Sequence, residues 1–466
     1  MTQLYVCREF PIETGKVLQF LYSSKELQRS NGGLAVGPVS AHVVNNPKYI
    51  ETLKSMNTPC CSPSEVIFSP NVQQSLYCHL LCGLMFRDEV QFVSSVFAHA
   101  LILAFRTFEQ IWKELCSDIR SGVLSSRITI PTLRCAMSSK VLIKPNAELA
   151  DRIRAKCERL TENDWYGVIP ELFPHAKYIH SVMTGTMQPY VKKLRQYAGE
   201  LPLLCSDYGA SEGWVGLNVN PRSLPEMALF TVLPNVAYFE FIPLKNIEDL
   251  EPSVVDLTQV KVGEQYEVVI TNGLGLYRYR LGDIVEVRGF HNSSTPQLRF
   301  VRRKNLLLNI DIDKNTEEDV QLSVETAAKI LSDDSSSNLE LLDFTSHVNK
   351  STYPGHYVVF WEVSGEENDH LHHHHHHQVL QECCNCLDSS FVDMGYMISR
   401  KARTIGPLEL KVVRRGTFNK ILDHYVGLGT AATQFKSPRF VGDTNGAVLE
   451  ILRNSVVMTY SSTAYS

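Results

Sequence analysis

The sequence predicts an α/β protein with a large multi-sheet N-terminal domain, residues 1–303, and a smaller, mobile α+β C-terminal domain, residues 304–466. Three observations predict this organisation. At 466 residues the chain is too long for one hydrophobic core. Strand-like and helix-like patterns alternate along the chain as far as the basic pair Arg302-Arg303. A shorter series of strands and helices follows that pair.

The large domain is expected to begin its regular structure with a buried strand at residues 90–93. Apolar residues at helical spacing come next: Phe97, Leu101, Ala104, Phe105, Phe108, Ile111, Trp112 and Leu115. We interpret these side chains as core residues. Further strands are expected at residues 201–204, 237–242, 266–270 and 284–287, because turn residues and charges separate these apolar runs.

The small domain is expected to start with an apolar strand and then a helix. Thr316 is followed by three acidic residues, which is typical of a helix N-cap. The later patterns predict strands at residues 339–344 and 356–363, a helix through the cysteine cluster, a strand at 408–413 and a last helix after Gly416. The resulting order, β-α-β-β-α-β-α, is typical of a small α+β domain.

Composition narrows the choice of partner and compartment. The formal net charge is -5 and the basic residues are scattered, which argues against a nucleic-acid partner and favours a small molecule. The first sixteen residues show no secretory signal, and the longest uncharged run, residues 90–105, is too short to cross a bilayer. Twelve cysteines without a signal are expected to stay reduced. We therefore predict a cytoplasmic protein with no membrane partner.

A metal site is conceivable near Cys383, Cys384 and Cys386, since His372–His377 lie just upstream. A second pair of cysteines at this spacing is absent from the sequence. The three cysteines also fall in a helical pattern with Val379, Leu380 and Leu387, which favours core packing over metal binding.

The stretch Leu203–Asn218, "LLCSDYGASEGWVGLN", has two interpretations. Gly209–Gly213 fits G-x-S-x-G, the nucleophile elbow of serine hydrolases, which requires a helix after the serine. Gly213, Gly216 and Pro221 argue against that helix. The alternative is a loop for ATP. Tyr208 would lie against adenine, Gly209 would admit the phosphate, Ser211 would donate to it and Glu212 would hold magnesium.

Two later segments offer groups that complement such a loop. In "GLYRYRLGD" a turn at Leu281–Asp283 can aim the carboxylate of Asp283 at the two ribose hydroxyls. In "RRGTFNKI" a glycine-led turn can bring Lys420 to charge that develops at the α-phosphate. Each has a simpler alternative: Arg278, Arg280 and Asp283 as a surface ion-pair cluster, and Lys420 as a solvated helix residue.

In this order, Tyr208–Glu212, Tyr277–Asp283, Arg302-Arg303 and Lys420 resemble the adenylate-forming ligase pattern. The whole chain resembles the plant acyl-acid amido synthetases, the auxin-responsive family that joins hormones to amino acids. The segments that carry this resemblance include "NGGLAVG", "SSRITIPTLR", "IHSVMTGTMQPYVKKLRQYAGELPL", "GLYRYRLGD", "GPLELKVVRRGTF" and "QFKSPR". "CSPSEVIFSP", "FAHALILAFRTFEQIW" and "CCNCLD" are most similar to the jasmonate–isoleucine branch.

The resemblance implies an adenylate-forming large domain and a two-step ligation that uses ATP and Mg2+. A carboxylic acid, with jasmonic acid expected, becomes an acyl-adenylate, and an amino acid, with isoleucine expected, attacks it to form an amide. The implied catalytic residues are Lys420, Glu212 and Ser211. The implied nucleotide-binding residues are Thr184, Gly185, Thr186, Met187, Tyr208, Gly209, Ala210, Ser211, Glu212, Tyr279, Asp283 and Lys420, with Glu212 on the metal. The implied substrate-binding residues are Ser206, Trp214 and Phe97, and Arg302 and Arg303 form the implied hinge. We expect a monomer.

Three departures from the family pattern bear on activity. The family has a glycine-rich phosphate loop that would lie upstream of "REFPIETGK", so we expect an N-terminally truncated, incomplete large domain. Ser206 stands where the jasmonate branch has a histidine, and the histidine run is an insertion. Two alternatives therefore stay open: an inactive member that binds nucleotide or acid weakly, and a ligase that uses coenzyme A.

Overall fold

The computed structural model describes residues 6, 8–12, 14–21, 28–29, 32–33, 35–36, 59–69, 71–246, 253–303, 306–311, 313–333, 339–364, 374–430, 432 and 435–465. The chain divides into two compact units. The first unit is Met1–Leu281, Val285–Val301 and Gly429–Gln434, and the second unit is Gly282–Ile284, Arg302–Leu428 and Phe435–Ser466. Among the described residues no helix is long and apolar enough to cross a bilayer.

A parallel sheet forms the centre of the first unit. Its strands lie in the order β1 (Lys16–Phe20), β4 (Val90–Phe97), β5 (Ile179–Val182) and β6 (Leu203–Leu204), and all neighbouring pairs are parallel. The predicted strand at residues 90–93 is confirmed and continues to Phe97. A two-stranded ribbon, β2 (Gln28–Arg29) with β3 (Ala35–Val36), also belongs to this part of the chain.

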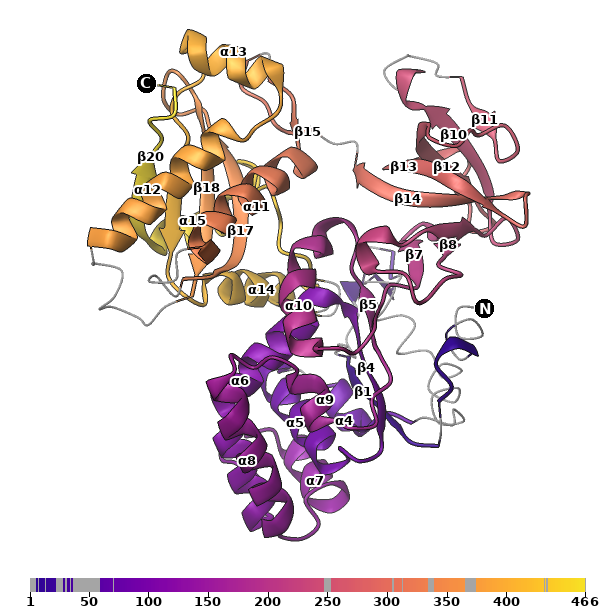
Figure 1. Ribbon diagram of the computed structural model, residues 1–466, viewed down its shortest axis with the longest axis vertical. Helices are drawn as coiled ribbons and strands as arrows, with labels where there is room; N and C mark the ends of the chain where they lie inside the picture. The colour runs from indigo at the N-terminus through magenta and orange to yellow at the C-terminus, as the bar shows by residue number, and fades with distance from the viewer. Residues whose placement is uncertain are drawn as a thin grey trace. The chain divides into compact units, whose positions relative to one another are not determined.

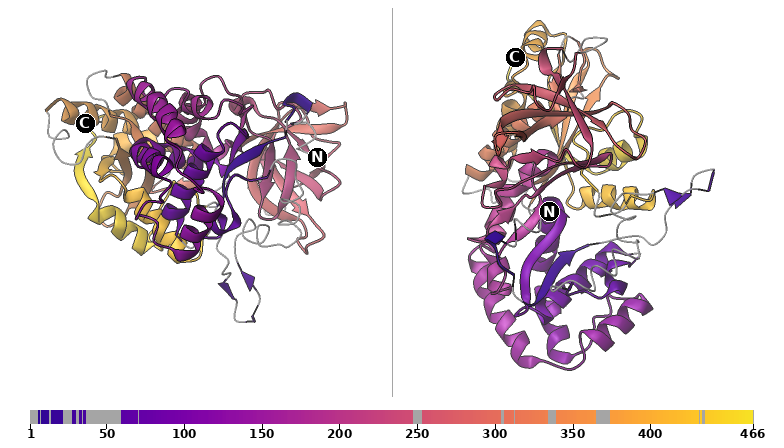
Figure 2. Two further views of the ribbon diagram at one scale, coloured as in Figure 1. Left: turned by 90° about the horizontal axis from the view of Figure 1, so that it is seen from below. Right: turned by 90° about the vertical axis from the view of Figure 1, so that its right-hand side faces the viewer.

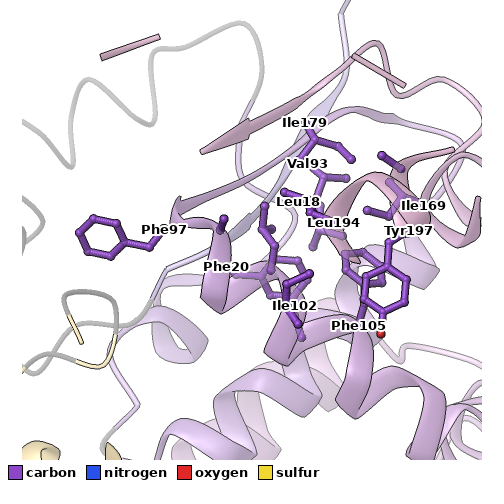
Figure 3. Close-up of a cluster of buried hydrophobic side chains, with 14 of the residues drawn as sticks. Leu18, Phe20, Val93, Phe97, Ile102, Phe105, Ile169, Ile179, Leu194 and Tyr197 are labelled. Carbon is purple, nitrogen blue, oxygen red and sulfur yellow. The ribbon is translucent and has the colours of Figure 1, made fainter. Parts of the chain in front are cut away.

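Helices cover the parallel sheet (Figures 1 and 2). The apolar side chains of the sheet and the helices form one buried cluster. The predicted helix is confirmed as α6 (Ala98–Ser121), which contacts β1 and β4. Figure 3 shows Phe105 of this helix with Phe20, Ile102, Leu194 and other side chains in the core beneath the sheet. The other helices are α4 (Ser64–Ile67), α5 (Val72–Met85), α7 (Pro131–Lys140), α8 (Ala147–Glu162), α9 (Val168–Leu172), η1 (Gly185–Tyr190) and α10 (Val191–Ala198).

An eight-stranded sheet follows, in the order β11-β10-β12-β13-β14-β9-β8-β7. Its strands are β7 (Asp207–Ala210), β8 (Gly213–Leu217), β9 (Phe230–Val232), β10 (Tyr238–Pro243), β11 (Val255–Asp256), β12 (Gln265–Thr271), β13 (Tyr279–His291) and β14 (Thr295–Arg303), with short helices η2 (Pro225–Met227) and η3 (Leu244–Asn246). The predicted strands at residues 237–242, 266–270 and 284–287 are confirmed.

The expected turn at Leu281–Asp283 is wrong, because these residues lie inside β13. Gly282 has a φ of +74°, a conformation that glycine adopts without steric cost. The strand therefore continues past the glycine, and Leu281 and Asp283 on either side of it are both buried.

The second unit carries a mixed sheet in the order β17-β18-β19-β20. Its strands are β17 (Leu341–Asn349), β18 (His356–Val363), β19 (Glu409–Val413) and β20 (Val456–Ser461); β18 and β19 are parallel and the other pairs antiparallel. A small ribbon joins β15 (Leu306–Leu308) to β16 (Asn315–Thr316). The helices are α11 (Glu317–Asp333), α12 (His374–Ser389), α13 (Met394–Ala402), α14 (Thr417–Gly427) and α15 (Gly446–Asn454), and α11 and α12 lie side by side on the sheet (Figure 1).

The predicted cap of α11 is confirmed, since the amide of Asp319 donates to Oγ1 of Thr316 at 3.3 Å and the amide of Thr316 donates to Oδ2 of Asp319 at 2.7 Å. The prediction that α14 ends the fold is wrong: α15 and β20 follow. β20 is a sheet edge whose exposure alternates along the strand, so only half of its side chains give an apolar signal.

The cysteine cluster packs into the core of the second unit. Cys383 and Cys384 are fully buried, and their Sγ atoms lie 3.5 Å from the carbonyl oxygen of Ala327 and 3.7 Å from that of Leu408. His372 and His373 are outside the described residues, as are the side chains of His374 and His375. In the rest of the chain, as far as the structure describes it, no group of metal ligands is found and the cysteines are free. These contacts agree with core packing.

Candidate active site

Three predicted site residues lie at, or two residues after, the carboxyl ends of neighbouring parallel strands. Phe97 ends β4 and pairs with Val182, the last residue of β5; Thr184 comes two residues after β5, and Ser206 comes two residues after β6. Ligands of α/β proteins bind outside this edge of a parallel sheet. The edge therefore brings these residues together in the first unit.

Phe97 stands at the boundary between the core and this edge. Only 8% of its surface is exposed. Figure 3 shows its ring pointing away from Phe20, Phe105 and Leu194, which pack with one another under the sheet. Its side chain thus leaves the sheet on the side where the strands end.

Ser206 belongs to a polar network with His180 and Asp207. Its hydroxyl donates to Oδ2 of Asp207 at 2.9 Å, and Nε2 of His180 lies 2.5 Å from Oγ of Ser206 itself. Because the hydroxyl has one proton, it accepts from His180, whose Nε2 is therefore the protonated nitrogen. Ser206 is 1% exposed, and its carbonyl accepts from the amide of Asn218 at 2.8 Å, so its position is fixed from both sides.

The segment after β5 lies against two other parts of the first unit. Thr184 hydrogen-bonds the Cys205 thiol, whose pKa burial raises to about 11. Gly185 has a φ of +60°, and a Cβ there would lie 3.0 Å from Cε1 of Phe300. Met187 is buried in the core, and the side chain of Thr186 is outside the described part of the structure.

Ser211 and Glu212 form the two-residue connection of the β7–β8 hairpin, in which Ala210 pairs with Gly213. A strand follows the serine instead of a helix, so the geometry of a nucleophile elbow is absent at this position. Ser211 is exposed and Glu212 half-buried. Nδ2 of Asn272 donates to the carbonyl oxygen of Glu212 at 2.6 Å. This bond holds the turn through its backbone and leaves the carboxylate available.

Aromatic rings surround the start of this hairpin. Tyr208 is 7% exposed, and its ring centre lies 5.5 Å from that of Phe230 and 5.9 Å from that of Phe300. Trp214 is half exposed and covers Gly209, where a Cβ would lie 3.2 Å from Cε3 of the indole. The missing side chain of Gly209 therefore makes room for Trp214 in this structure.

The segment Tyr277–Asp283 is divided between the two units. Tyr279 opens β13 and is 41% exposed. Arg278 pairs with Glu240 at 2.9 Å and Arg280 pairs with Glu267, so both arginines bind carboxylates on neighbouring strands. Each arginine therefore has an ion-pair partner of its own within the first unit.

Asp283 is 2% exposed and lies in the second unit, 3.0 Å from Nε of Arg303. Lys436, in the "QFKSPR" segment, belongs to the same neighbourhood. Burial and the charge of Arg303 lower the pKa of Lys436, while Asp283 and Glu317 act in the opposite direction. A buried carboxylate and two cations are thus held together within one unit.

Lys420 is exposed on the first turn of α14, also in the second unit. The start of this helix is fixed by the buried carboxylate of Glu362. Its two oxygens accept from the amides of Gly416 at 2.8 Å and Phe418 at 2.9 Å. An acidic side chain at a helix N-terminus satisfies amides that have no partner inside the helix. Glu362 therefore sets the direction in which the Lys420 turn leaves the sheet.

Family models match three stretches of the chain: the GH3 family N-terminal domain at residues 1–203, the central domain at 230–303 and the C-terminal domain at 318–445. The chain belongs to the GH3 family. The α/β fold with several sheets is the one this family adopts, as the sequence predicts. A solved GH3.15 acyl acid amido synthetase superposes on this chain with a TM-score of 0.83 at 36% identity. The match covers 99% of this chain and 77% of that synthetase.

Among curated GH3 proteins, the chain is similar to jasmonoyl–L-amino acid synthetase JAR4 of Nicotiana attenuata, with 61% identity over 459 residues. It is also similar to jasmonoyl–L-amino acid synthetase GH3.5 of Oryza sativa subsp. japonica, with 52% identity over 469 residues. These matches cover 98% of this chain and 77% and 78% of the two relatives.

Sequence reasoning missed several residues that shape this GH3 site. His180, Asn272 and Phe300 come from separate strands or loops, and Glu362 is the second-last residue of a strand whose sequence is mostly apolar. Lys436 stood in a segment that carried the family resemblance but had no role assigned to it. That segment offered the one signal that could have been used.

Proposed function

We propose that this chain is an ATP-dependent ligase that adenylates a hormone carboxylic acid and joins it to an amino acid through an amide bond. We further propose jasmonic acid as the acid and isoleucine as the acceptor. The observation that supports this most directly is 61% identity, over 98% of the chain, to a jasmonoyl–L-amino acid synthetase. We place the reaction in the cytoplasm and expect a monomeric enzyme.

The reaction has two steps with balanced bonds. A carboxylate oxygen attacks the α-phosphorus of ATP, the bond to the bridging oxygen breaks, and pyrophosphate leaves. The neutral amine of the amino acid then attacks the acyl carbonyl, the bond to AMP breaks, and a proton passes from nitrogen to solvent. Holding the mixed anhydride in place makes the second step effectively unimolecular.

The β7–β8 turn fits the role of a phosphate and metal loop. The carboxylate of Glu212 is half-buried at a turn whose backbone Asn272 holds, and carboxylate oxygens are ligands that Mg2+ prefers. Magnesium, when bound, would offset the negative charge of the phosphates. The exposed hydroxyl of Ser211 is free to donate to a phosphate oxygen, and Tyr208 offers an aromatic wall for adenine.

The second unit supplies the other proposed roles. Asp283 would accept from the ribose hydroxyls, and Lys420 would neutralise charge developing at the α-phosphate. Lys436 is a second cation for the nucleotide, because it lies in the neighbourhood of Asp283. Arg302 and Arg303 are proposed as the hinge about which the second unit turns between the two steps.

The test is exchange of labelled pyrophosphate into ATP, driven by jasmonic acid, followed by mass spectrometry of the amide formed with isoleucine. We expect acid-dependent exchange, and amide only when isoleucine is added. Absence of exchange would leave an inactive binding protein. Exchange with transfer to coenzyme A, and none to amino acids, would instead identify a thioester-forming ligase.

A further inference from the structure

A small cavity lies at the edge of the sheet in the second unit, and none of the residues assigned to the reaction lines it. Its volume is about 250 Å3, and its lining includes Asn309, His347, Lys350, Phe440 and Asp443. All of these residues belong to the second unit. Pockets for drug-sized ligands measure roughly 300–1,000 Å3, so this one suits a smaller molecule.

The walls of the cavity are held by backbone hydrogen bonds. The chain at residues 439–441 runs parallel to β17 along its free edge. The amide of Ser346 donates to the carbonyl of Arg439 at 2.9 Å, and the amide of Val441 donates to the carbonyl of Ser346 at 2.8 Å. The strand and the added segment therefore carry their side chains in a fixed register.

His347 presents one defined nitrogen to this space. It is 4% exposed, and its Nδ1 lies 2.8 Å from the carbonyl oxygen of Val441. A carbonyl only accepts, so Nδ1 carries the proton and Nε2 of the neutral ring is an acceptor. Nε2 lies 3.9 Å from Oδ1 of Asp443, which is too far for a hydrogen bond. One ammonium group placed between the two atoms can donate to both.

The remaining lining groups have complementary chemistry. Lys350, just after β17, supplies an exposed ammonium, and Phe440 supplies apolar surface. We propose that this cavity binds the zwitterion of an apolar α-amino acid. Its ammonium would lie at His347 and Asp443, its carboxylate at Lys350, and its side chain at Phe440. None of these lining residues has a role in the proposed ligase, so the proposal does not depend on that function.

The experiment measures binding of L-isoleucine to the full chain by equilibrium dialysis, without ATP or acyl acid. We expect saturable binding that Asp443→Asn and Lys350→Met each weaken about tenfold or more, because each removes a charge-assisted hydrogen bond. Glu450→Gln and Lys401→Met change exposed groups outside the cavity and should bind as the wild type does. Two analogues each lack one charged group of isoleucine: 2-methylbutylamine lacks the carboxylate and 3-methylpentanoate lacks the ammonium. Each should bind about tenfold more weakly than isoleucine.

His347→Asn is the sharpest variant. The asparagine amide can keep the bond to the carbonyl of Val441 while Nε2 is lost, so the unfolding temperature should stay close to that of the wild type and binding should fall. Wild-type affinity in His347→Asn and Asp443→Asn, or no saturable binding at millimolar isoleucine, would overturn the proposal. Acid-dependent pyrophosphate exchange should be unchanged in these variants. Its loss together with binding would overturn the separation of the two sites, whereas a wild type without exchange would contradict only the proposed function.

Discussion

The two units hold their proposed reaction groups in different ways. In the first unit Ser211 and Glu212 stand on a two-residue turn between strands; Asn272 binds the backbone of this turn, and Tyr208 in the preceding strand packs on Phe230 and Phe300. In the second unit Lys420 stands on the first turn of a helix, and one buried carboxylate, Glu362, binds the amides at the start of that helix. The hairpin is thus held by a backbone hydrogen bond and ring packing, and the helix start by one buried charge.

This difference teaches where each unit is vulnerable. The contacts that hold the hairpin do not use the side chains of Ser211 and Glu212, so substitutions there should change ligand binding and leave the hairpin in place. A single buried charge that binds two amides has no substitute, because removing it leaves donors unsatisfied. Substitutions in the first unit should therefore separate catalysis from stability, and those at Glu362 should couple them.

Glu212→Gln tests the first half of this comparison and carries the largest expected effect. It keeps the size of the side chain and the backbone bond to Asn272 but loses the charge that would bind magnesium. We expect acid-dependent pyrophosphate exchange to fall on the order of 10²–10³-fold, with an unchanged unfolding temperature. Glu200→Gln, at an exposed site near Tyr166, is the control and should keep wild-type exchange. Full exchange in Glu212→Gln would remove this residue from the site.

Glu362→Gln tests the second half. The side-chain oxygen of the new glutamine can accept from one backbone N–H, but its NH2 group faces the other N–H. The second unit should therefore lose about 1.5–3 kcal/mol of unfolding free energy. We expect the exchange rate to fall about tenfold or more in the same variant, because the Lys420 turn loosens. Chemical unfolding and exchange kinetics measure the two effects. Glu382→Gln on α12 is the matched control, and a stability loss with a normal exchange rate would contradict the positioning role.

Protonation also distinguishes the two units. His79 in the first unit is fully buried, with Nε2 3.0 Å from the carbonyl of Leu21, and burial lowers its pKa to about 4. Because the pKa of His79 is lower in the folded state, the unfolded chain takes up a proton first as pH falls from 6.5 toward 4. This protonation favours unfolding, and the penalty is absent above pH 6.5. The unfolding free energy should therefore drop by about 2 kcal/mol between pH 7 and pH 5.

Glu409 in the second unit makes a constant contribution to stability over that range. The hydrogen bond from His356 and the neighbouring Lys411 lower its pKa to about 2. Its contribution to stability is complete above pH 4.5 and is lost only as pH falls through 2. His79→Gln should therefore flatten the pH dependence between 7 and 5, measured by urea unfolding, whereas Glu409→Gln should leave that slope unchanged. An equal slope in His79→Gln would contradict this assignment.

Gly185→Ala tests the close approach on which the first unit depends. The new methyl group would lie 3.0 Å from Cε1 of Phe300, and the alanine would have to adopt the positive φ of Gly185. We expect a loss of about 1–2 kcal/mol in unfolding free energy and weaker ATP binding. Adding Phe300→Leu should relieve the contact but not the backbone strain. Gly427→Ala, where nothing lies within 4 Å, is the control and should not be destabilising.

Ser211→Ala has the smallest expected effect. A neutral hydrogen bond contributes about 0.5–1.5 kcal/mol, so exchange should fall about tenfold or less. Fluorophosphonate should not label the wild-type protein at this serine, because the hairpin lacks the helix of a hydrolase site. Stoichiometric labelling of Ser211 would restore the hydrolase interpretation, and complete loss of exchange in the alanine variant would contradict the small expected effect.

Local pattern predicted much of the fold. The apolar spacing from Phe97 to Leu115 predicted α6, and the acids after Thr316 predicted the start of α11. It failed where the signal was not local: Gly282 reads as a turn but lies inside a paired strand, and β20 gives only a half-apolar pattern. In the candidate site, the pattern around Tyr208–Glu212 predicts a nucleotide loop, but it could not show that His180 binds Ser206 or that Trp214 covers Gly209.

By itself the sequence determined the chemical types at each position, the order of most strands and helices, and the family. Hydrophobic periodicity and capping act over a few residues, so they can be read along the chain. Tertiary structure alone decided which distant groups meet: Asn272 with the Glu212 turn, Glu362 with α14, and His347 with the segment at Val441. Those contacts join residues 60, 54 and 94 positions apart, as their numbers show, and only the packing of whole sheets brings such residues together.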